Sequence, residues 1–189
     1  MNQNPVSLRQ AKYKGGLLTK NIFSFTYTSQ GIAFLALWLF APCAHAQTPV
    51  SMADTNFIFA AAQGGMTEVK LGALAVQQGM RDDVKQFGHM MVKDHSAIND
   101  DLKSLAAQKG LTLPDGLDAK HQAMLDKLSA RSGSAFDDAY IAAMIKGHKK
   151  DAKAFKAEAN MTQDADIKRF LDKSIPIVEA HLKLIKTMK

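Results

Sequence analysis

Residues 84–105 read VKQFGHMMVKDHSAINDDLKSL, and apolar or small side chains recur along them every three or four positions. This spacing brings the recurring side chains onto one face of an α-helix, the face that turns towards a protein core. Three other stretches, at about 52–78, 134–159 and 164–188, have the same spacing. Alanine, leucine, lysine and methionine dominate them, and runs of β-branched residues are absent, as is typical of helices. The sequence therefore predicts an all-α fold with four long helices.

The predicted helices have capping signals at their ends. Ser51 and Asp54 stand three positions apart, as do Ser134 and Asp137, which is the spacing of a capping box at a helix start. Gly79 is a typical residue just beyond a helix end. These signals predict that the first helix begins after Ser51 and that the third long helix begins after Ser134.

The connection between the second and third long helices is longer than the others. It contains the loop 110–116, with two glycines and a proline, and a short helix at about 119–130, for which Asp118 is the expected cap. Short turns within two helix pairs, with a long connection between the pairs, predict a ferritin-like four-helix bundle with a short extra helix in the crossover. In the last helix, Pro176 removes one backbone hydrogen bond and predicts a kink.

The first 46 residues have the composition of a secretory signal peptide. Residues 1–30 contain four basic and no acidic side chains, residues 31–41 form an uncharged apolar run, and Ala44-His45-Ala46 is a small-x-small cleavage site. The apolar run is shorter than the roughly 20 residues of a membrane-spanning helix. We expect cleavage near Ala46, a mature helical domain over 47–189 without a transmembrane helix, and a periplasmic or secreted location.

Cys43 is the only cysteine of the chain, so the expected mature domain forms no disulfide and depends on burial for its stability. The position of Cys43 after the apolar run also allows attachment of a lipid. The preceding Phe40-Ala41-Pro42 departs from the usual lipoprotein pattern, and lipidation of Cys43 stays open.

The basic character of the chain lies largely in the leader. The whole sequence has 24 basic and 18 acidic residues, and four of the basic ones precede Gln47, which leaves 20 against 18 and a net charge of +2. These charges are interspersed along the helices, and we expect no binding to nucleic acid. One basic run predicts a solvated helix face or a contact with anionic components of the cell envelope; it consists of Lys146, Lys149, Lys150, Lys153 and Lys156.

Each of the four apolar faces carries one ionisable residue at a core position. In chain order these residues are Glu68, His95, His148 and His181. Counted from the turns at 1.5 Å per residue, Glu68 and His95 differ in height by about 4.5 Å, and His148 and His181 by about 10 Å. The first pair is therefore expected to meet, and the second to meet only if the kink at Pro176 shortens the separation.

Two interpretations of these four residues stay open. They hydrogen-bond to one another as partly buried polar residues, or they bind a single transition-metal ion, because imidazoles with one carboxylate suit zinc, copper or iron. A carboxylate-bridged di-iron centre is not expected, because Val92 and Val178 stand where a Glu-x-x-His motif needs glutamate.

Several motifs, taken in order, resemble a known family. They are FIFAAAQGGMTEVKLGAL at 57–74, MVKDH at 91–95, FDDAY at 136–140, and the later His148, Pro176 and His181. Over about residues 51–188 they resemble the bacterial exported proteins grouped as domain of unknown function 4142, which are often labelled predicted outer membrane proteins. The resemblance implies a ferritin-like bundle and an envelope location, and it points to the same three histidines, but it implies no reaction.

No catalytic residue is predicted, because no nucleophile arrangement or phosphate-binding loop has a recognisable context. The leading interpretation is a periplasmic binding or envelope-stress protein that holds one metal ion between its helices. One alternative is a metal-dependent ferritin-like oxidoreductase with Tyr140 near the site. Another is a structural or interaction module of the cell envelope, and the oligomeric state stays open.

Overall fold

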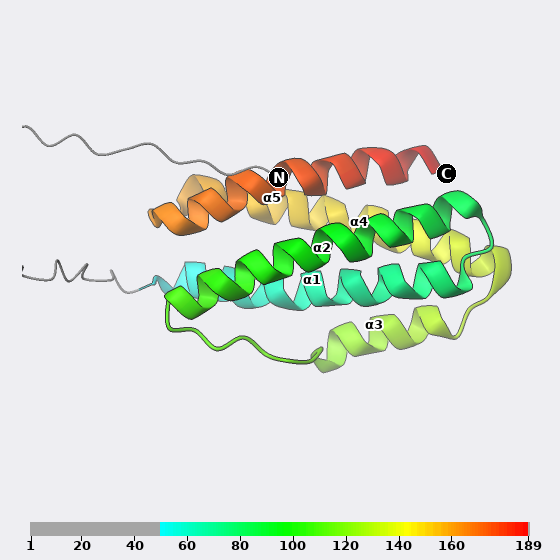
Figure 1. The fold of residues 1–189 in the computed structure, drawn as a ribbon, viewed down its shortest axis with the longest axis horizontal. Helices are drawn as coiled ribbons and strands as arrows, with labels where there is room; N and C mark the ends of the chain where they lie inside the picture. Colours follow the sequence, from blue (N-terminus) through cyan, green and yellow to red (C-terminus); the bar gives the residue numbers. More distant parts are fainter. Residues whose placement is uncertain (1–49, 189) are drawn as a thin grey trace, which may run out of the picture. The chain divides into compact units, whose positions relative to one another are not determined.

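The computed structural model describes residues 50–188, so the predicted signal peptide and Cys43 lie outside the described residues. Within 50–188 the chain is helical and contains no strand, which confirms the all-α prediction (Figure 1). None of the described helices is both long and apolar enough to cross a lipid bilayer. The helices are α1 (Met52–Gln78), α2 (Asp82–Gln108), α3 (Ala119–Ser129), α4 (Gly133–Met161), α5 (Ala165–Ile185) and the closing 3₁₀ turn η1 (Lys186–Met188).

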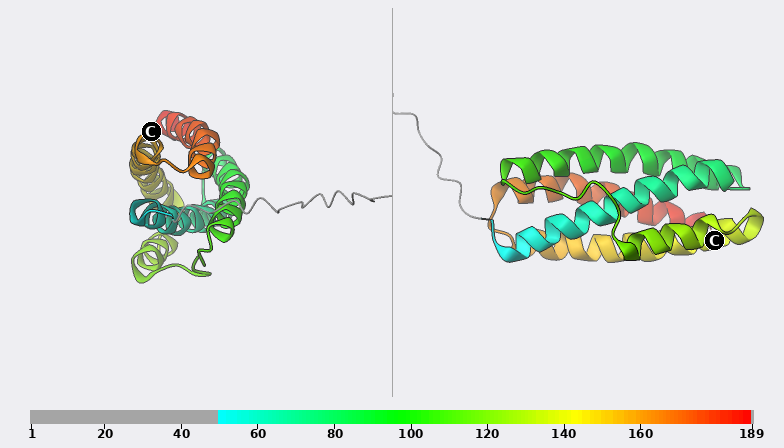
Figure 2. Two further views of the ribbon diagram at one scale, coloured as in Figure 1. Left: turned by 90° about the vertical axis from the view of Figure 1, so that its left-hand side faces the viewer. Right: turned by 90° about the horizontal axis from the view of Figure 1, so that it is seen from below.

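The four long helices form a closed ring. α1 packs against α2 and α4, and α5 packs against α4 and α2, as the end-on view in Figure 2 shows. The loop after α2 and the short helix α3 return the chain to the opposite end of the bundle, so that α4 runs antiparallel to α1 (Figure 1). α3 lies outside the ring, against α1 and α4. This is the predicted four-helix bundle with an extra helix in its crossover.

The apolar core is divided into two clusters. One cluster surrounds Phe87, Phe136 and Tyr140, and the other surrounds Ile58 and Phe170. On every long helix the polar residue predicted at a core position stands between residues of the first cluster and residues of the second; these residues are Glu68, His95, His148 and His181. A buried polar layer therefore crosses the bundle between two apolar layers, and its polar atoms need partners because water is largely excluded.

Several predicted helix ends are confirmed. Ser51 is the N-cap of α1, and its hydroxyl oxygen accepts a hydrogen bond from the backbone N–H of Asp54 at 3.0 Å. Asp118 caps α3 in the same way, with its carboxylate accepting from the backbone N–H of His121 at 2.8 Å. Gly110 lies just beyond α2 with φ at 69°, a left-handed conformation that favours glycine after a helix end.

The capping box predicted for Ser134 and Asp137 is wrong. α4 begins at Gly133, ahead of Ser134. Its N-cap is Ser132, whose side chain makes no capping hydrogen bond. The Asp137 carboxylate instead accepts hydrogen bonds from the backbone N–H groups of Met80 at 3.0 Å and Arg81 at 2.9 Å. It thus accepts from the N-cap of α2, Arg81, whose N–H has no partner within the helix, and from Met80 just before it. This buried carboxylate ties α4 to the turn between α1 and α2.

α1 and α2 approach each other closely where two glycines face across the helix pair. A Cβ atom added at Gly88 would stand 2.7 Å from the carbonyl oxygen of Gly72, and one added at Gly72 would stand 2.9 Å from that of Gly88. Both distances are shorter than the van der Waals contact distance of a carbon and an oxygen atom. The absence of side chains here sets the spacing of the two helices one to two turns from Glu68 and His95.

α5 continues as one α-helix through Pro176. Proline has no N–H to donate to the preceding turn, so one intrahelical hydrogen bond is missing there. The kink proposed for this position stays a prediction.

Candidate metal centre

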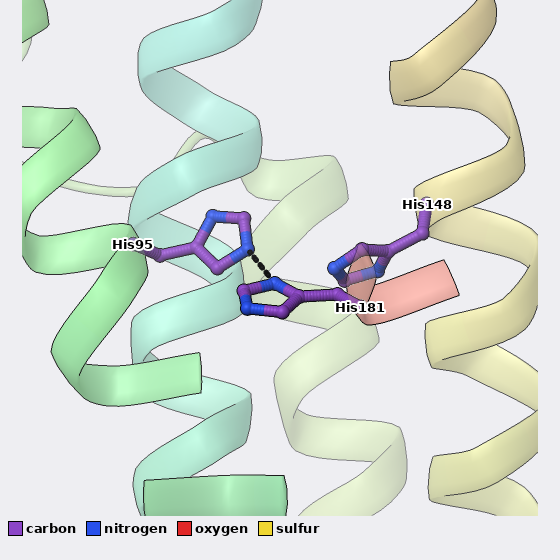
Figure 3. Close-up of side chains that lie close together, drawn as sticks. All are labelled: His95, His148 and His181. Atoms are coloured by element: carbon purple, nitrogen blue, oxygen red, sulfur yellow. Dashed lines mark hydrogen bonds between the residues drawn. The ribbon is translucent and has the colours of Figure 1, made fainter. Parts of the chain in front are cut away.

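Three imidazoles gather in the polar layer (Figure 3). The ring centroids of His95 and His148 are 5.4 Å apart, those of His95 and His181 5.2 Å, and those of His148 and His181 5.5 Å. One nitrogen of each ring lies within 4.8 Å of a nitrogen of both other rings, and all three residues are buried. Three buried histidines in this arrangement could bind a metal ion.

The structure brings His148 and His181 closer than the sequence predicts, and the expected height difference of about 10 Å is wrong. That expectation placed the turn at Met161. α4 ends at Met161 and α5 begins at Ala165, so the middle of the turn is at Gln163. Counted from there, His148 lies 15 residues before and His181 18 residues after, a difference of three residues or about 4.5 Å. The same difference separates Glu68 and His95, and all four residues therefore share one layer.

A chain of close polar contacts runs through three helices. Oε2 of Glu68 on α1 lies 2.9 Å from Nδ1 of His95 on α2. Nε2 of His95 lies 3.3 Å from Nδ1 of His181 on α5, the contact drawn in Figure 3. Nε2 of His181 then lies 3.0 Å from Oδ2 of Asp94, which returns the chain to α2. Each imidazole in this chain thus has one nitrogen facing a carboxyl group and the other facing its neighbour.

His148 has a different environment. Its Nδ1–H donates to the backbone carbonyl oxygen of Met144 at 3.0 Å, which leaves Nε2 as the nitrogen without a proton. This Nε2 atom is buried and has no hydrogen-bond partner. A buried lone pair without a donor is costly, and buried polar groups of native proteins normally have a partner. His148 therefore presents an unused ligand atom to the layer.

Two proton arrangements satisfy the contact chain differently. If the Glu68 carboxyl carries a proton, it donates to His95, His95 donates to His181, and His181 donates to Asp94. If Glu68 is ionised, it accepts from Nδ1–H of His95, and the facing nitrogens of His95 and His181 both carry lone pairs. Two lone pairs 3.3 Å apart repel unless a cation lies between them. Nitrogens bound to a tetrahedral ion at about 2.05 Å stand about 3.4 Å apart, so the separation of these two nitrogens fits two ligands of one ion.

Burial controls the charge of the layer. It lowers the pKa of His95 and His148 to about 4, and it lowers the pKa of His181. The three imidazoles are therefore neutral at neutral pH, which is the form that binds metal ions. Burial also raises the pKa of Glu68. The pKa of Asp151 rises to about 7, first because of burial and then because of the negative charge of Glu68.

Two acidic residues of the layer, Asp94 and Asp151, have no role assigned to them from the sequence. On a helical wheel Asp94 points away from His95, but its carboxylate reaches His181 on the neighbouring helix. Asp151 stands three positions after His148 and interacts with Glu68. The spacing His-x-x-Asp at 148–151 was a usable signal for Asp151, because residues three apart share a helix face. No local signal identifies Asp94, since its partner is 87 residues away.

Tyr140 lies in the apolar cluster next to the layer. Its ring stacks on Phe136 with centroids 5.9 Å apart and meets the edge of Phe87 at 6.3 Å. The hydroxyl is buried without a hydrogen-bond partner, and burial together with the charge of Glu68 raises its pKa. Tyr140 is thus near the layer but makes no hydrogen bond to it.

Comparison with known proteins is consistent with this architecture. The family model described as domain of unknown function (DUF4142) matches residues 40–188. The fold is similar to the crystal structure of a DUF305 fragment from Deinococcus radiodurans, with a TM-score of 0.66 and 10% sequence identity over 75% of this chain and 97% of that chain. At this identity the likeness concerns the fold alone. None of the curated proteins matches the chain significantly.

Proposed function

The chain belongs to the DUF4142 family, and we propose that this member binds one transition-metal ion between its helices. The ligands in this proposal are Nε2 of His95, Nε2 of His148 and Nδ1 of His181. The remaining nitrogen of each ring has an acceptor: Glu68 for His95, the Met144 carbonyl oxygen for His148 and Asp94 for His181. Metal-binding histidines typically have such an acceptor behind them, because it holds the ring and selects the tautomer.

The observation that carries the proposal is the unpartnered Nε2 atom of His148. When Glu68 is protonated, every contact in the row Glu68–His95–His181–Asp94 is a satisfied hydrogen bond. These four residues alone therefore give no reason to expect a metal ion. This proton arrangement gives His148 no donor for its Nε2 atom, which has no hydrogen-bond partner. A metal ion in the layer would satisfy all three nitrogens at once.

The chemistry of the ligands limits the kind of ion. Three neutral imidazoles suit zinc, copper or iron(II), and they suit calcium and magnesium poorly, since these prefer oxygen ligands. The three helices supply three ligands, and Glu68 lies behind His95 and is not part of the imidazole cluster. A fourth position is thus available to water or to another small ligand. When bound, the ion would supply a Lewis-acid or redox centre.

We propose further that this metal binding takes place outside the cytoplasm. The proposal rests on the leader-like composition of residues 1–46. Expression of the full chain in a bacterium, followed by cell fractionation and mass measurement, tests it. A periplasmic product shortened near Ala46 supports export, whereas a cytoplasmic product of full length contradicts it.

Elemental analysis tests the metal site. Residues 47–189, produced without a histidine tag and incubated with zinc, copper or iron, are expected to retain about one equivalent of metal after desalting. The variants His95→Ala and His148→Ala are expected to retain less than about a tenth of an equivalent. His89→Ala is the matched control, because His89 lies exposed on the same helix as His95 and should leave the content unchanged.

A metal content below about a tenth of an equivalent in the parent protein would contradict the proposal. The polar layer would then be a hydrogen-bonded core feature. Equal metal content in the parent and in both variants would also contradict it, because the ion would lie elsewhere.

A further inference from the structure

A small cavity adjoins the polar layer on the side away from Tyr140. Its volume is about 20 Å³, enough for about one water molecule. The walls come from all four long helices and are mostly apolar, including Ile98, Leu102 and Phe155. Its polar lining consists of Glu68, His95 and Asp151. The cavity therefore ends at the carboxyl group that contacts the first histidine of the proposed metal site.

The proposed metal site has no opening along the axis of the bundle. Apolar clusters cover the polar layer from both ends, with Phe87 and Tyr140 on one side and Phe155 and Phe170 on the other. The three histidines are at most 3% exposed. An ion must therefore pass between helices to reach them.

The cavity offers such a passage because α1 has no side chain at Gly64. A Cβ atom added at Gly64 would have no neighbour within 4 Å. Gly64 and Asp151 both line the cavity and both are half-buried, so the cavity approaches the surface between α1 and α4 at these two residues.

The carboxyl groups along this passage suit a cation, which can replace the proton that they hold. Glu68 is 8% exposed, and its carboxyl group interacts directly with that of Asp151, so the two carboxyl groups lie side by side at the cavity. Nδ1 of His148 lies 3.4 Å from Oε1 of Glu68, but its hydrogen bond goes to the Met144 carbonyl oxygen. Lys150 is the opposing charge near the passage, but it is exposed and therefore screened by solvent. The carboxyl groups of Glu68 and Asp151 are less exposed than Lys150 and therefore less screened.

We infer that this cavity is the access route by which a divalent transition-metal ion reaches the imidazoles, with the Glu68 and Asp151 carboxylates as its first binding point. Since a cavity of this size holds about one water molecule, an ion has to lose most of its water there. Carboxylate oxygens replace that water as zinc ligands at about 2.0–2.2 Å. The inference rests on the proposed metal site but is distinct from it, because a route determines rates whereas the ligands determine the equilibrium.

The kinetics of loading test the route. Metal-free residues 47–189 are mixed with Co²⁺, whose visible absorption reports coordination, and the bound ion is then removed with excess chelator. Gly64→Leu fills the cavity from a position with free space and is expected to slow loading and release by about tenfold or more. The amount of Co²⁺ bound at equilibrium should stay the same. Ala157→Leu, at an exposed position of α4, is the control and should load at the parent rate.

A second variant addresses the carboxylates without adding volume. Asp151→Asn is expected to slow loading at low salt and to weaken the dependence of the loading rate on ionic strength. Parent-like loading rates in both Gly64→Leu and Asp151→Asn, with Co²⁺ bound normally, would overturn the route and leave the metal site intact. If the parent binds none of Co²⁺, Zn²⁺, copper and iron, the metal site and the route both fail.

Discussion

At the scale of single residues, the polar layer depends on which nitrogen of each imidazole carries the proton. His148 is held in one tautomer by a backbone carbonyl oxygen of its own helix. His95 and His181 depend on side chains instead, Glu68 on α1 and Asp94 on α2. The acceptors behind the rings therefore matter as much as the rings, since they decide which lone pairs face the centre of the layer.

The role of Asp94 gives the first prediction. Asp94→Ala leaves the Nε2–H group of His181 without an acceptor and is expected to weaken metal binding by about 10- to 100-fold. Asp94→Asn keeps an acceptor oxygen and should retain most of the affinity. Competition between the protein and a chelator of known affinity measures both variants.

The control for this prediction is Asp100→Ala, at an exposed position of the same helix, which should bind like the parent. Parent-like affinity in Asp94→Ala would mean that the contact with His181 does not position a ligand.

Asp54 and Glu158 form a pH-dependent pair at the end of the bundle where α1 begins and α4 ends. Burial raises the pKa of Asp54, but hydrogen bonds with Ser51, Thr162 and Glu158 lower it by more. The net pKa of Asp54 is therefore below its ordinary value. Burial and the neighbouring Asp54 raise the pKa of Glu158 to about 7. Because this value is above that of an unfolded chain, the protonated form of Glu158 stabilises the fold; this contribution is complete below pH 4.5 and disappears as the pH rises through 7.

Glu158→Gln tests this assignment, because an amide can donate to Asp54 at any pH. The parent is expected to lose roughly 2–3 kcal/mol of stability relative to Glu158→Gln between pH 5 and pH 8. Urea unfolding of both proteins at the two pH values measures the difference. A stability difference that is the same at pH 5 and pH 8 would contradict the raised pKa.

At the scale of helices, the position of His95 relative to Glu68 depends on how closely α1 and α2 approach. The contact between Gly72 and Gly88 brings the two backbones together, and a side chain at either glycine would meet a backbone carbonyl oxygen that cannot rotate away. The heights of His148 and His181 along the bundle axis depend on the length of the loop between α4 and α5. Both features belong to helix pairs and not to single helices.

Gly88→Ala is predicted to separate α1 from α2. The added carbon would meet the Gly72 carbonyl oxygen, and the free energy of unfolding should fall by about 1–3 kcal/mol despite the better helix propensity of alanine. Gly64→Ala is the matched control on α1, where the added carbon meets nothing, and it should gain about 0.5–1 kcal/mol. Denaturant unfolding at one pH measures both variants, and a Gly88→Ala protein as stable as the parent would refute the close contact.

At the scale of the whole molecule, the fold has to bury a polar layer between two apolar clusters. The charges that a carboxylate and imidazoles would carry in water are suppressed by burial, as the shifted pKa values of the layer indicate. Four helices from both halves of the chain contribute to this layer. A bound ion would connect α2, α4 and α5 through direct bonds and so join the two helix pairs.

Metal binding is therefore expected to stabilise the entire bundle. At a free ion concentration of 100 times the dissociation constant, the gain is about 2.7 kcal/mol. For a domain of this size, that gain corresponds to a rise in Tm of roughly 6–12 °C. Calorimetry with and without zinc measures the shift, and His148→Ala should show none. A parent protein whose Tm is unchanged by saturating zinc, copper and iron would argue against the site.

The sequence alone was enough to predict the helices, the N-caps Ser51 and Asp118, the bundle with its extra crossover helix, and the four residues of the polar layer. It could do so because helical periodicity and capping are properties of neighbouring residues. The tertiary structure alone decided that Asp137 serves the start of α2, that His148 and His181 share a height, and that Asp94 lies behind His181. These contacts join residues 56 to 87 positions apart or depend on the geometry of a turn. They follow from the rotation and relative height of packed helices, which no local pattern in the chain encodes.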